Sequence, residues 1–434
     1  MYYGLYLVVS WLFFIIALPF FLLYCGFTGK HRNSFGQRLG FIRKSAWQSD
    51  NSLRIWLHAA SVGEVQLAKV LIAELKKNLP DAKFVLSTFT EQGQSVAHES
   101  LGSEIPCIYA PIDLSFAVNK FLRIIKPTLY ICLETELWPT MLVQAQKFGV
   151  KLLLLNGRIS EGSFKHYLCL RGLSRKVLAN FSAITVIQQD DARRFISLGA
   201  NPETLQVLGN AKYDLPTIGQ QQKTEDYYRI KCSLPVNQLV LVCGSTHTGE
   251  EKLLLQAFLA LKALQHDSVW IVAPRHLRRL PEVITLFQEH NLSFELLSSI
   301  MMHNRRKADV ILVDKMGELA GLYSVARYIF CGGSLINRGG HNVMEAALWG
   351  KPVFYGPNMQ DFIDAKELLE SAGAGFSVTT PGELVQGIMR FEDNPDKYMA
   401  AGAKASGIVL AQQGTAAKQA QVVVNILQKP SSAN

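Results

Sequence analysis

The sequence has seven cysteines, and no two of them are spaced Cys-x-x-Cys. Most lie in apolar runs, which predicts small buried side chains in a reducing compartment rather than disulfides or a zinc site. A Walker A sequence and a DxD-like acidic pair are also missing, which argues against ATP hydrolysis by a phosphate-binding loop of that type and against a metal-held diphosphate. Zinc-finger spacing and RNP patterns are absent, so the net charge of +9 does not indicate nucleic acid as a partner.

Charge is absent from the N-terminal segment. Residues 5–27 contain no charged side chain, and such a run is long enough to cross a hydrocarbon core of about 30 Å as a helix. A cleavable signal peptide would start with basic residues, and none precedes the apolar run. We therefore predict an uncleaved membrane anchor over residues 1–28.

A basic segment follows at residues 29–53. It holds five cations, Lys30, Arg32, Arg38, Arg43 and Lys44. Basic residues beside a membrane span stay on the cytoplasmic side and attract anionic head groups, so we expect cytoplasmic catalytic domains and contact with an anionic membrane surface. The alternative is a linker whose charges only keep it soluble.

The remaining chain alternates apolar strands with helices, which is typical of parallel sheets covered on both faces. A length of 434 residues favours two such domains. We predict an α/β fold with two Rossmann-like domains facing a cleft, whose ligands bind at the carboxyl ends of the strands. The predicted boundaries are 54–208 for the first domain, 209–237 for a linker, 238–428 for the second domain with its terminal helix, and 429–434 for a disordered tail.

Individual elements follow from the same pattern. Strands are expected at 54–59, 83–88, 105–110, 128–133 and 151–156, with another that ends near Val186, and in the second half at 238–244, 269–274, 310–314, 328–333 and 352–355. Helices are expected at 65–78, 91–101, 114–125, after Trp138, and at 250–264, 280–290, 317–326, 342–349, 382–391 and 396–427.

Carboxylates follow two predicted strands of the first domain. His58, Ser61, Gly63 and Glu64 come after the first strand, and a carboxylate there can reach a substrate hydroxyl as a general base. The alternative is a capping box with Ser61 at the N-cap and Glu64 at the third helical position, which needs no function.

A second acidic motif is Glu134-Thr135-Glu136-Leu137-Trp138-Pro139, directly after a buried strand. Two carboxylates there need solvent, a hydrogen-bond donor or an ion pair. Helix entry accounts for Trp138-Pro139, but it leaves Glu134 unexplained. Arg158 follows the next strand in the same way, and Lys212 lies at the linker, within reach of either domain.

Anion-friendly residues end four predicted strands of the second domain. They are Ser245, Thr246 and His247, then Pro274, Arg275 and His276, then Met316, Gly317 and Glu318, and finally Gly332, Gly333, Ser334, Gly340, His341, Asn342, Val343, Met344 and Glu345. Arg275 can bind an anion with two parallel hydrogen bonds. Four such strand ends favour a phosphate-bearing nucleotide.

The glycine-rich stretch after the strand at 328–333 is the most informative of these. Glycines let the backbone approach an anion closely, and a helix start offers unpaired N–H groups. Asn342 is the expected N-cap, with Glu345 placed for a capping box. An ordinary strand-loop-helix turn remains the alternative, because glycine loops alone are weak evidence.

The motifs together resemble the Kdo (3-deoxy-D-manno-octulosonic acid) transferases, inner-membrane glycosyltransferases of lipopolysaccharide biosynthesis with the GT-B fold. The resemblance rests on HAASVGE, ETELWP, NGRIS, GNAKYD, GSTHTGEE, APRH, MGEL and GGSLINRGGHNVMEAAL. It implies CMP-Kdo as the donor, a lipid A precursor (lipid IVA) as the acceptor, inversion at the anomeric carbon, and no metal or other cofactor. It also implies Glu64 as the base, Glu134 and Glu136 in the acceptor-side active site, and contacts to CMP from the Pro274, Met316 and Asn342 motifs.

Two positions depart from the family pattern. NGRIS has Gly157 where many members have Ala, and GNAKYD has Ala211 where a bulkier apolar residue is common. Neither change removes a charged group, so we expect activity to survive. Two other functions remain open. One is another GT-B nucleotide-sugar transferase or an epimerase, and the other is a membrane-tethered nucleotide-binding protein without chemistry.

Overall fold

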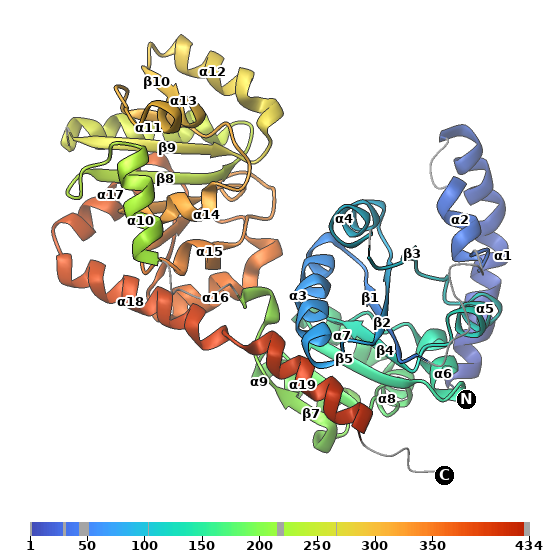
Figure 1. The fold of residues 1–434 in the computed structure, drawn as a ribbon. Coiled ribbons are helices and arrows are strands. Elements are labelled where there is room, and N and C mark those ends of the chain that lie inside the picture. Colours follow the sequence, from blue (N-terminus) through green and yellow to red (C-terminus); the bar gives the residue numbers. More distant parts are fainter. Residues whose placement is uncertain are drawn as a thin grey trace. The chain divides into compact units, whose positions relative to one another are not determined.

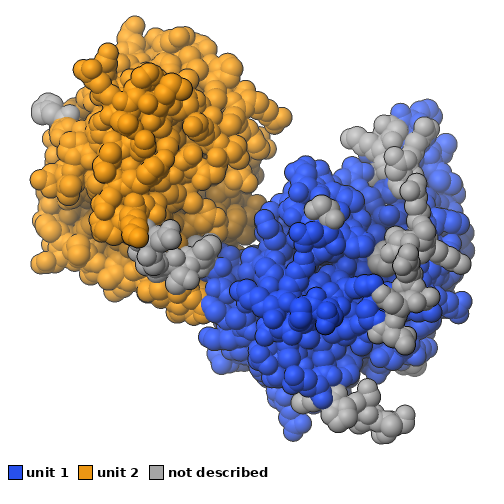
Figure 2. Space-filling model, in the orientation of Figure 1, with its two compact units in different colours: residues 1–214, 414–434 blue, residues 215–413 orange. Residues whose placement is uncertain are grey.

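The computed structural model describes residues 2–28, 32–42, 52–102, 104–214, 221–265 and 267–428. The chain divides into two compact units (Figure 2): unit 1 holds residues 1–214 and 414–434, and unit 2 holds residues 215–413. The predicted basic residues Lys30, Arg43 and Lys44 and the tail at 429–434 lie outside the described residues.

Unit 1 is built on one parallel sheet with the order β3-β2-β1-β4-β5-β6-β7 (Figure 1). Its strands are β1 (Arg54–Ala59), β2 (Lys83–Thr88), β3 (Cys107–Tyr109), β4 (Leu129–Leu133), β5 (Lys151–Gly157), β6 (Ala183–Val186) and β7 (Leu205–Val207). Its helices are α1 (Tyr2–Thr28), α2 (Arg32–Arg38), α3 (Val62–Asn78), α4 (Glu91–Leu101), α5 (Ser115–Ile125), α6 (Pro139–Lys147), α7 (Glu161–Cys169), α8 (Arg171–Leu178), α9 (Gln189–Leu198), the 3-10 turns η2 (Pro202–Thr204) and η3 (Ala211–Tyr213), and α19 (Thr415–Gln428).

Unit 2 repeats the architecture with the order β10-β11-β9-β8-β12-β13-β14. Its strands are β8 (Leu239–Thr246), β9 (Ser268–Pro274), β10 (Phe294–Leu296), β11 (Val310–Leu312), β12 (Tyr328–Cys331), β13 (Val353–Tyr355) and β14 (Gly375–Ser377). Its helices are α10 (Gln221–Lys231), α11 (Glu250–Leu264), α12 (Leu280–Glu289), α13 (Leu297–His303), α14 (Leu319–Leu322), α15 (Val343–Ala347), α16 (Ile363–Ala372), α17 (Pro381–Glu392) and α18 (Pro395–Gln412), with 3-10 turns η4 (Leu277–Arg279), η5 (Tyr323–Val325) and η6 (Gln360–Phe362).

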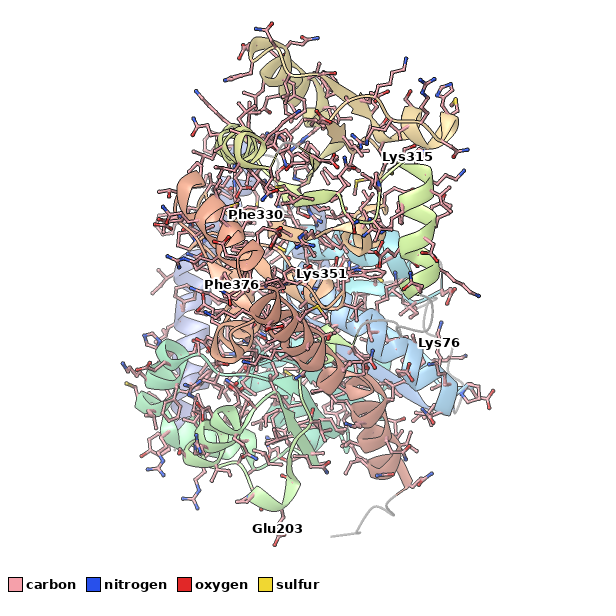
Figure 3. The ribbon with its side chains drawn as sticks, turned by 90° about the vertical axis from the view of Figure 1, so that its left-hand side faces the viewer. Lys76, Glu203, Lys315, Phe330, Lys351 and Phe376 are labelled. Atoms are coloured by element: carbon pink, nitrogen blue, oxygen red, sulfur yellow. The ribbon has the colours of Figure 1, made fainter. Side chains whose placement is uncertain are left out.

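Apolar runs form the strands because helices cover both faces of each sheet. All five residues of β4 and all eight of β8 are buried. Phe330 of β12 is fully buried in the unit 2 core, where Phe376 of β14 packs against the same cluster (Figure 3). A strand buried on both faces reads as a continuous apolar run, and this is the pattern that the sequence shows.

The terminal helical stretch differs from the prediction. It is broken at Gly414, whose φ of 73° suits glycine, into α18 in unit 2 and α19 in unit 1. Asp214 accepts hydrogen bonds from the N–H groups of Gly414 (2.9 Å) and Ala416 (2.8 Å) and so fixes the start of α19. The assignment of the terminal helix to the second domain is therefore corrected, since its apolar side packs into the unit 1 core.

Two further elements differ from the prediction. The segment 209–237, expected to be a linker, contains η3 in unit 1 and α10 in unit 2, so much of it belongs to the two units themselves. The helix expected at 342–349 is the short α15. It has little more than one turn, so it offers a much smaller dipole than a full helix.

Helix α1 is long and apolar, with a mean hydropathy of 2.5 over its most apolar window. Its exposed side chains are large and apolar, for example Leu5, Ile16 and Phe20 at 64%, 64% and 71% exposure. The opposite face packs on unit 1, where Tyr3 is buried and the Tyr6 hydroxyl donates to Asp113 Oδ2 at 2.7 Å. One face of α1 is thus occupied by protein and the other is exposed.

Candidate active site

The acidic candidates of unit 1 lie where two neighbouring central strands end. β1 and β4 pair in parallel, with β2 and β3 on one side and β5 to β7 on the other. Such a reversal of strand order is the switch point at which open parallel sheets bind their ligands. Glu64 follows β1, and Glu134 and Glu136 follow β4, so the strand order places the two motifs at this switch point.

Glu64 lies in the first turn of α3 and is only 5% exposed. Its Oε2 accepts the Ala60 N–H at 2.7 Å, and its Oε1 accepts the Ser61 hydroxyl at 2.9 Å. The Ser61 side chain makes no bond to the helix backbone, so the reciprocal capping box is not formed. Burial and the Glu134 carboxylate raise the pKa of Glu64 to about 8. A pKa near the working pH suits a general base.

Glu134 adopts a left-handed backbone conformation with φ of 54°. This conformation costs a non-glycine residue about 1–3 kcal/mol, and such strain gathers at functional sites. The Glu134 carboxylate forms an ion pair with Lys212 of η3, and both side chains are mostly buried. The pair brings the GNAKYD motif to the acidic site of unit 1.

Glu136 is held by the indole of Trp138, whose Nε1 donates to Glu136 Oε2 at 3.0 Å. Burial raises the pKa of Glu136, and the Glu134 carboxylate adds to that effect. The site therefore contains three carboxylates and one lysine. Two of the carboxylates, Glu64 and Glu136, are shifted toward the protonated form.

His58 is more deeply placed than the other candidates of unit 1. It is 1% exposed, and its Nδ1 lies 3.0 Å from Ser87 Oγ, which also accepts the Trp56 indole N–H at 2.8 Å. Burial lowers the pKa of His58 to about 4, so the ring is neutral near pH 7. These contacts favour a packing role for His58.

Gly63 and Arg158 border the acidic site from two sides. A Cβ at Gly63 would lie 3.4 Å from Lys212 Nζ, an ordinary van der Waals contact, so the lysine reaches the start of α3. Arg158 follows β5 and is half-buried, and its carbonyl accepts the Thr135 hydroxyl. The loops after β4 and β5 are thereby joined.

Unit 2 repeats the arrangement at its own switch point. β8 and β12 pair in parallel, with β9 and β13 on their outer sides. Ser245, Thr246 and His247 end β8, Pro274, Arg275 and His276 end β9, and the stretch from Gly332 to Glu345 follows β12. The four predicted strand ends therefore follow consecutive strands of the sheet, in the order β11, β9, β8 and β12. Met316, Gly317 and Glu318 follow β11, one strand further out, and Glu318 accepts the Tyr228 hydroxyl at 2.6 Å.

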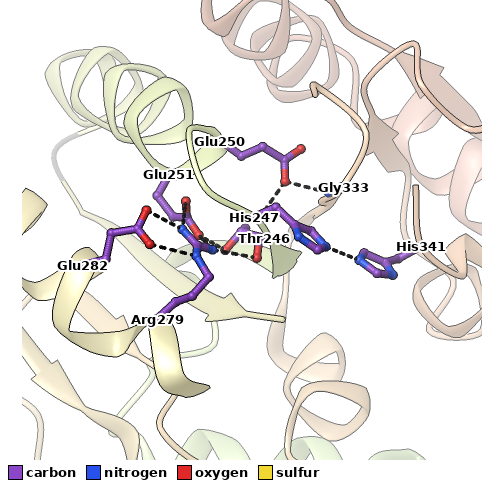
Figure 4. A network of polar contacts seen from close by, with 8 residues as sticks. All are labelled: Thr246, His247, Glu250, Glu251, Arg279, Glu282, Gly333 and His341. Atoms are coloured by element: carbon purple, nitrogen blue, oxygen red, sulfur yellow. Dashed lines mark hydrogen bonds and ion pairs between the residues drawn. The ribbon is translucent and has the colours of Figure 1, made fainter. Parts of the chain in front are cut away.

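A buried carboxylate occupies the first glycine loop (Figure 4). Glu250 is 0% exposed, and its carboxylate accepts the N–H groups of His247 (3.0 Å), Gly333 (2.6 Å), Ser334 (3.0 Å) and Leu335 (2.9 Å). These donors form the kind of backbone nest that binds anions. Because Glu250 already occupies it, Gly333 and Ser334 are not available to a phosphate in this structure.

Close packing explains the glycine and serine of the same loop. A Cβ on Gly332 would lie 2.7 Å from the Ser245 carbonyl oxygen, so only glycine fits. Ser334 is fully buried, where it donates to the Cys331 carbonyl at 2.5 Å and accepts the Gly356 N–H at 2.8 Å. Both residues hold the loop in shape.

Three histidines and an arginine gather beside this loop. His247 and His341 have their Nε2 atoms 2.9 Å apart, and the His276 ring centre lies 5.9 Å from that of His247. Burial, with help from Arg275, lowers the pKa of His341 to about 3, and burial also lowers the pKa of His247. Groups that disfavour each other's positive charge are suited to an anion, which would offset that repulsion.

Asn342 is the predicted N-cap. Its Oδ1 accepts the Met344 N–H at 3.1 Å, and its Nδ2 donates to Glu345 Oε1 at 3.3 Å. Glu345 thus binds the amide side chain rather than closing a capping box. Burial raises the pKa of Glu345. Val343 and Met344 are fully buried, so their contribution to a ligand site is limited to backbone groups.

Gly340 is also a conformational requirement. Its φ is 78°, and an added Cβ would lie 2.3 Å from the Met359 sulfur. Its N–H donates to the Gly333 carbonyl at 2.9 Å, which fixes the return of the loop.

Two charged residues that the sequence pattern did not single out complete the unit 2 network. Arg279 donates to Glu251 Oε1 at 2.7 Å and Oε2 at 3.0 Å, and Glu251 Oε1 accepts the Thr246 hydroxyl at 2.7 Å (Figure 4). Glu250 and Glu251 were expected only as residues of a helix start. The sequence does not show that these two carboxylates are buried. An acidic pair at a helix start is normally explained by the helix dipole alone.

The described residues contain no group of three or more His, Cys, Asp or Glu side chains arranged to hold a metal ion.

Comparison with known proteins gives a consistent result. The family model described as "3-Deoxy-D-manno-octulosonic-acid transferase (kdotransferase)" matches residues 33–215. A 3-deoxy-D-manno-octulosonic acid transferase of Chlamydophila psittaci is 30% identical over 389 residues, which cover 89% of this chain and 88% of that protein. A bifunctional glycosyltransferase/methyltransferase of Fusobacterium nucleatum is 34% identical over 361 residues, and the chain spans 55% of its length.

Among solved structures, the UDP-GlcNAc 2-epimerase of Neisseria meningitidis aligns with a TM-score of 0.56 and 14% identity over 87% of this chain and 100% of that chain. At this identity the likeness concerns the fold alone. With the two parallel sheets described above, it confirms the predicted GT-B fold. The similarity to the transferases extends over most of the sequence, and the chain belongs to the Kdo transferase family of glycosyltransferases.

Proposed function

We propose that the protein transfers Kdo from CMP-Kdo to a lipid A precursor, with inversion at the anomeric carbon. Family membership supports the reaction class. The observation that carries the proposal is Glu64, a buried carboxylate with its pKa raised to about 8 at the switch point of the unit 1 sheet. Consistent with the family resemblance, the proposed reaction uses no metal.

In this reaction the ionised Glu64 takes the proton of an acceptor hydroxyl. The hydroxyl oxygen forms the new bond to the Kdo anomeric carbon, while the bond from that carbon to the CMP phosphate oxygen breaks and its electron pair leaves with CMP. The Glu134 carboxylate, which is paired with Lys212, repels the negative charge of ionised Glu64. Glu64 therefore keeps the proton once it has taken it. We assign Glu136, Ser61 and Arg158 to the acceptor side.

Donor binding is assigned to unit 2. Arg275 is an exposed cation that lies close to His341 and Glu345. Its charge opposes part of the rise that burial causes in the pKa of Glu345. We propose that it contacts the phosphate of CMP-Kdo, where a cation offsets the charge that grows on the leaving group. His247, His276 and the backbone near Asn342 line the same place.

A direct assay tests the proposal. The full chain in detergent is given CMP-Kdo with and without the acylated acceptor, and CMP release and product mass are measured. We expect CMP release and a product enlarged by Kdo only when the acceptor is present. Release without acceptor would indicate hydrolysis, and binding without release would indicate a nucleotide-binding protein. Either result would overturn the transferase proposal.

We further propose that α1 attaches the protein to the inner membrane, with both units in the cytoplasm. Its outward face is apolar, and Arg38 remains among the described residues of the basic segment. A helix that crosses the bilayer alone would break the Tyr6–Asp113 bond or carry Asp113 into hydrocarbon. The observed packing therefore favours a helix that lies against lipid through one face.

Protease protection of an N-terminal tag in sealed inverted vesicles separates the two arrangements. A tag that is digested together with the units supports the lipid-facing arrangement. A protected tag would place the N-terminus across the membrane. Deletion of residues 1–28 is expected to shift the protein toward the soluble fraction. If the truncated chain stays bound after a salt wash, α1 is not the main attachment.

A further inference from the structure

An apolar groove of about 890 Å³ runs between α1 and the body of unit 1. One wall is the inward face of α1, which includes Phe14, Ala17, Leu18 and Phe21. The other wall is formed by α2 and by the loops that follow β2, β3 and β4. The volume lies within the range of small-molecule pockets, about 300–1,000 Å³.

Asp113 and Arg38, two charged residues that line the groove, are both engaged with the protein. Asp113 accepts the N–H groups of Thr140 (2.9 Å) and Met141 (2.8 Å) as well as the Tyr6 hydroxyl. Arg38 stacks on Phe89, with its guanidinium carbon 4.7 Å from the ring centre, and donates to the Phe89 carbonyl. The surface left for a ligand is therefore mainly hydrocarbon and aromatic, which suits an apolar chain rather than a polar molecule.

The inner end of the groove adjoins the acidic site. Phe89 and Trp138 line the groove and stack with ring centres 5.4 Å apart. Trp138 also donates to Glu136, and the Thr90 hydroxyl donates at 3.2 Å to the carbonyl of Ala60. Ala60 in turn donates its N–H to Glu64. A molecule with its tail in the groove would hold its head group beside the proposed base.

The outer wall of the groove belongs to the helix with the apolar exposed face. Residues that contact the body recur along α1 at helical spacing, from Tyr3 and Tyr6 through Ser10 and Phe14 to Phe21, whose ring centre lies 4.9 Å from that of Phe35. The groove is thus bounded by the element that we assign to the membrane, so a chain leaving the lipid phase can enter it directly.

We propose that this groove binds one acyl chain of the lipid acceptor and thereby positions the acceptor sugar at Glu64. The inference rests on the proposed transferase function and adds a binding site for the acceptor tail within unit 1. It accounts for three features together: an apolar lining, continuity with the acidic site, and a wall supplied by the membrane helix.

A matched pair of substitutions tests the site. Leu18 lines the groove, whereas Leu12 is 56% exposed and does not line it. Leu18→Trp narrows the groove, and Leu12→Trp makes the same change on the outward face. The readout is the ratio of kcat/KM for the acylated acceptor to kcat/KM for its fully deacylated, water-soluble form. We expect Leu18→Trp to lower this ratio about tenfold, the effect of losing burial of about two methylene groups, and Leu12→Trp to leave it unchanged.

Chain length supplies a second readout that a purely structural role would not move. Leu18→Trp is expected to shift preference toward shorter acyl chains, and Leu18→Ala toward longer ones. Equal losses with both acceptors, or an unchanged ratio in a folded Leu18→Trp protein, would overturn the groove assignment. If the wild-type chain transferred Kdo to neither acceptor, the proposed function itself would fail, which is a different outcome.

Photochemical labelling distinguishes the acceptor from ordinary bilayer lipid. An acceptor with a diazirine at the end of one acyl chain is expected to label residues of the groove, and excess unlabelled acceptor should suppress that labelling. A diazirine phospholipid serves as the control probe. If it labelled the groove equally well in the presence of acceptor, the site would hold bilayer lipid and the proposal would be wrong.

Discussion

The two units carry sites of opposite character on the same scaffold. In unit 1 the switch point between β1 and β4 gathers Glu64, Glu134 and Glu136, and burial raises the pKa of Glu64 and Glu136. In unit 2 the switch point between β8 and β12 gathers cationic and titratable nitrogen groups, and burial lowers the pKa of His247 and His341. The same burial thus favours the neutral form in both units.

The difference shows what each site is suited to do. A carboxyl group whose pKa lies near physiological pH can exchange a proton with a hydroxyl at that pH. Neutral imidazoles beside a permanently charged arginine can bind an anion. When no anion is bound, they do not repel one another as several fixed positive charges would. The fold is repeated, while the chemistry is set by side chains at equivalent strand ends.

The largest expected effect comes from removing the base while keeping its shape. Glu64→Gln keeps an oxygen for the Ala60 N–H and the buried volume, but it cannot take a proton. We expect turnover on the acylated acceptor to fall by about 100-fold or more, with CMP-Kdo binding retained. The measurements are single-turnover kinetics and donor titration.

The matched control for that experiment is Glu136→Gln, which changes a half-buried carboxylate of the same site. Glu136 already receives the Trp138 indole N–H, so we expect a smaller loss. A Glu64→Gln enzyme with near-normal turnover would reassign the base to Glu134 or Glu136.

Much of this arrangement could be predicted from the sequence, because strands buried on both faces leave continuous apolar runs. β1, β2 and α4 have the predicted bounds, and so does α11. Strands of three residues at or near the sheet edges, such as β7, β10 and β14, are only partly buried and leave no such run. Their existence depends on pairing with neighbours.

The parts that could not be predicted depend on tertiary contacts. Strand order decides that β1 lies beside β4, and no local pattern encodes it. The position of α19 on unit 1 depends on two contacts. Asp214 accepts the Gly414 N–H, and Gln419 Nε2 donates to Asn156 Oδ1 at 3.3 Å. The glycine loop was expected to offer free N–H groups, whereas Glu250, far away in sequence, already binds them.

A second test concerns the cationic side of the comparison. Arg275→Ala removes a charge-assisted contact worth about 1.5–3 kcal/mol. We therefore expect Kd for CMP-Kdo to rise by about 10- to 150-fold, with little change in melting temperature because Arg275 is exposed.

Arg278→Ala is the matched control, since Arg278 is an exposed arginine of η4, three residues further along the chain. Its loss should change Kd by less than about threefold. Equal effects of the two substitutions would mean that only the overall field of the loop matters, and unchanged donor affinity in Arg275→Ala would place the donor phosphate elsewhere.

A third test examines Glu250, whose carboxylate occupies the backbone anion nest of unit 2. Glu250→Ala leaves four backbone N–H groups without their acceptor, which should cost about 2–4 kcal/mol and lower the melting temperature of unit 2 by about 4 °C or more. Added phosphate should restore part of the loss, because the vacated N–H groups form an anion nest. Differential scanning calorimetry with and without phosphate measures both effects.

Glu289→Ala, at an exposed site of the same unit, serves as the control for Glu250. It should leave the melting temperature and its phosphate dependence unchanged. Glu250→Ala without any loss of stability would contradict the role assigned to these hydrogen bonds.

The last test concerns the pH dependence that the raised pKa of Glu64 imposes on the stability of unit 1. Its pKa rises from an ordinary value of 4.5 to about 8 on folding, so its favourable contribution is fully present below pH 4.5 and is lost as the pH rises through 8. Glu64→Gln is neutral at every pH and escapes that loss. The melting temperature of Glu64→Gln relative to wild type should therefore rise between about pH 5 and pH 8 and level off above pH 8. Each kcal/mol of unfolding free energy corresponds to about 2–4 °C in melting temperature.

The control of opposite sign is Glu104, an exposed carboxylate of unit 1 whose pKa is lowered by Lys76. Glu104→Gln can only lose stability above pH 4.5. A flat difference between Glu64→Gln and wild type from pH 5 to 9 would show that Glu64 titrates normally, and it would remove the contrast between the two sites.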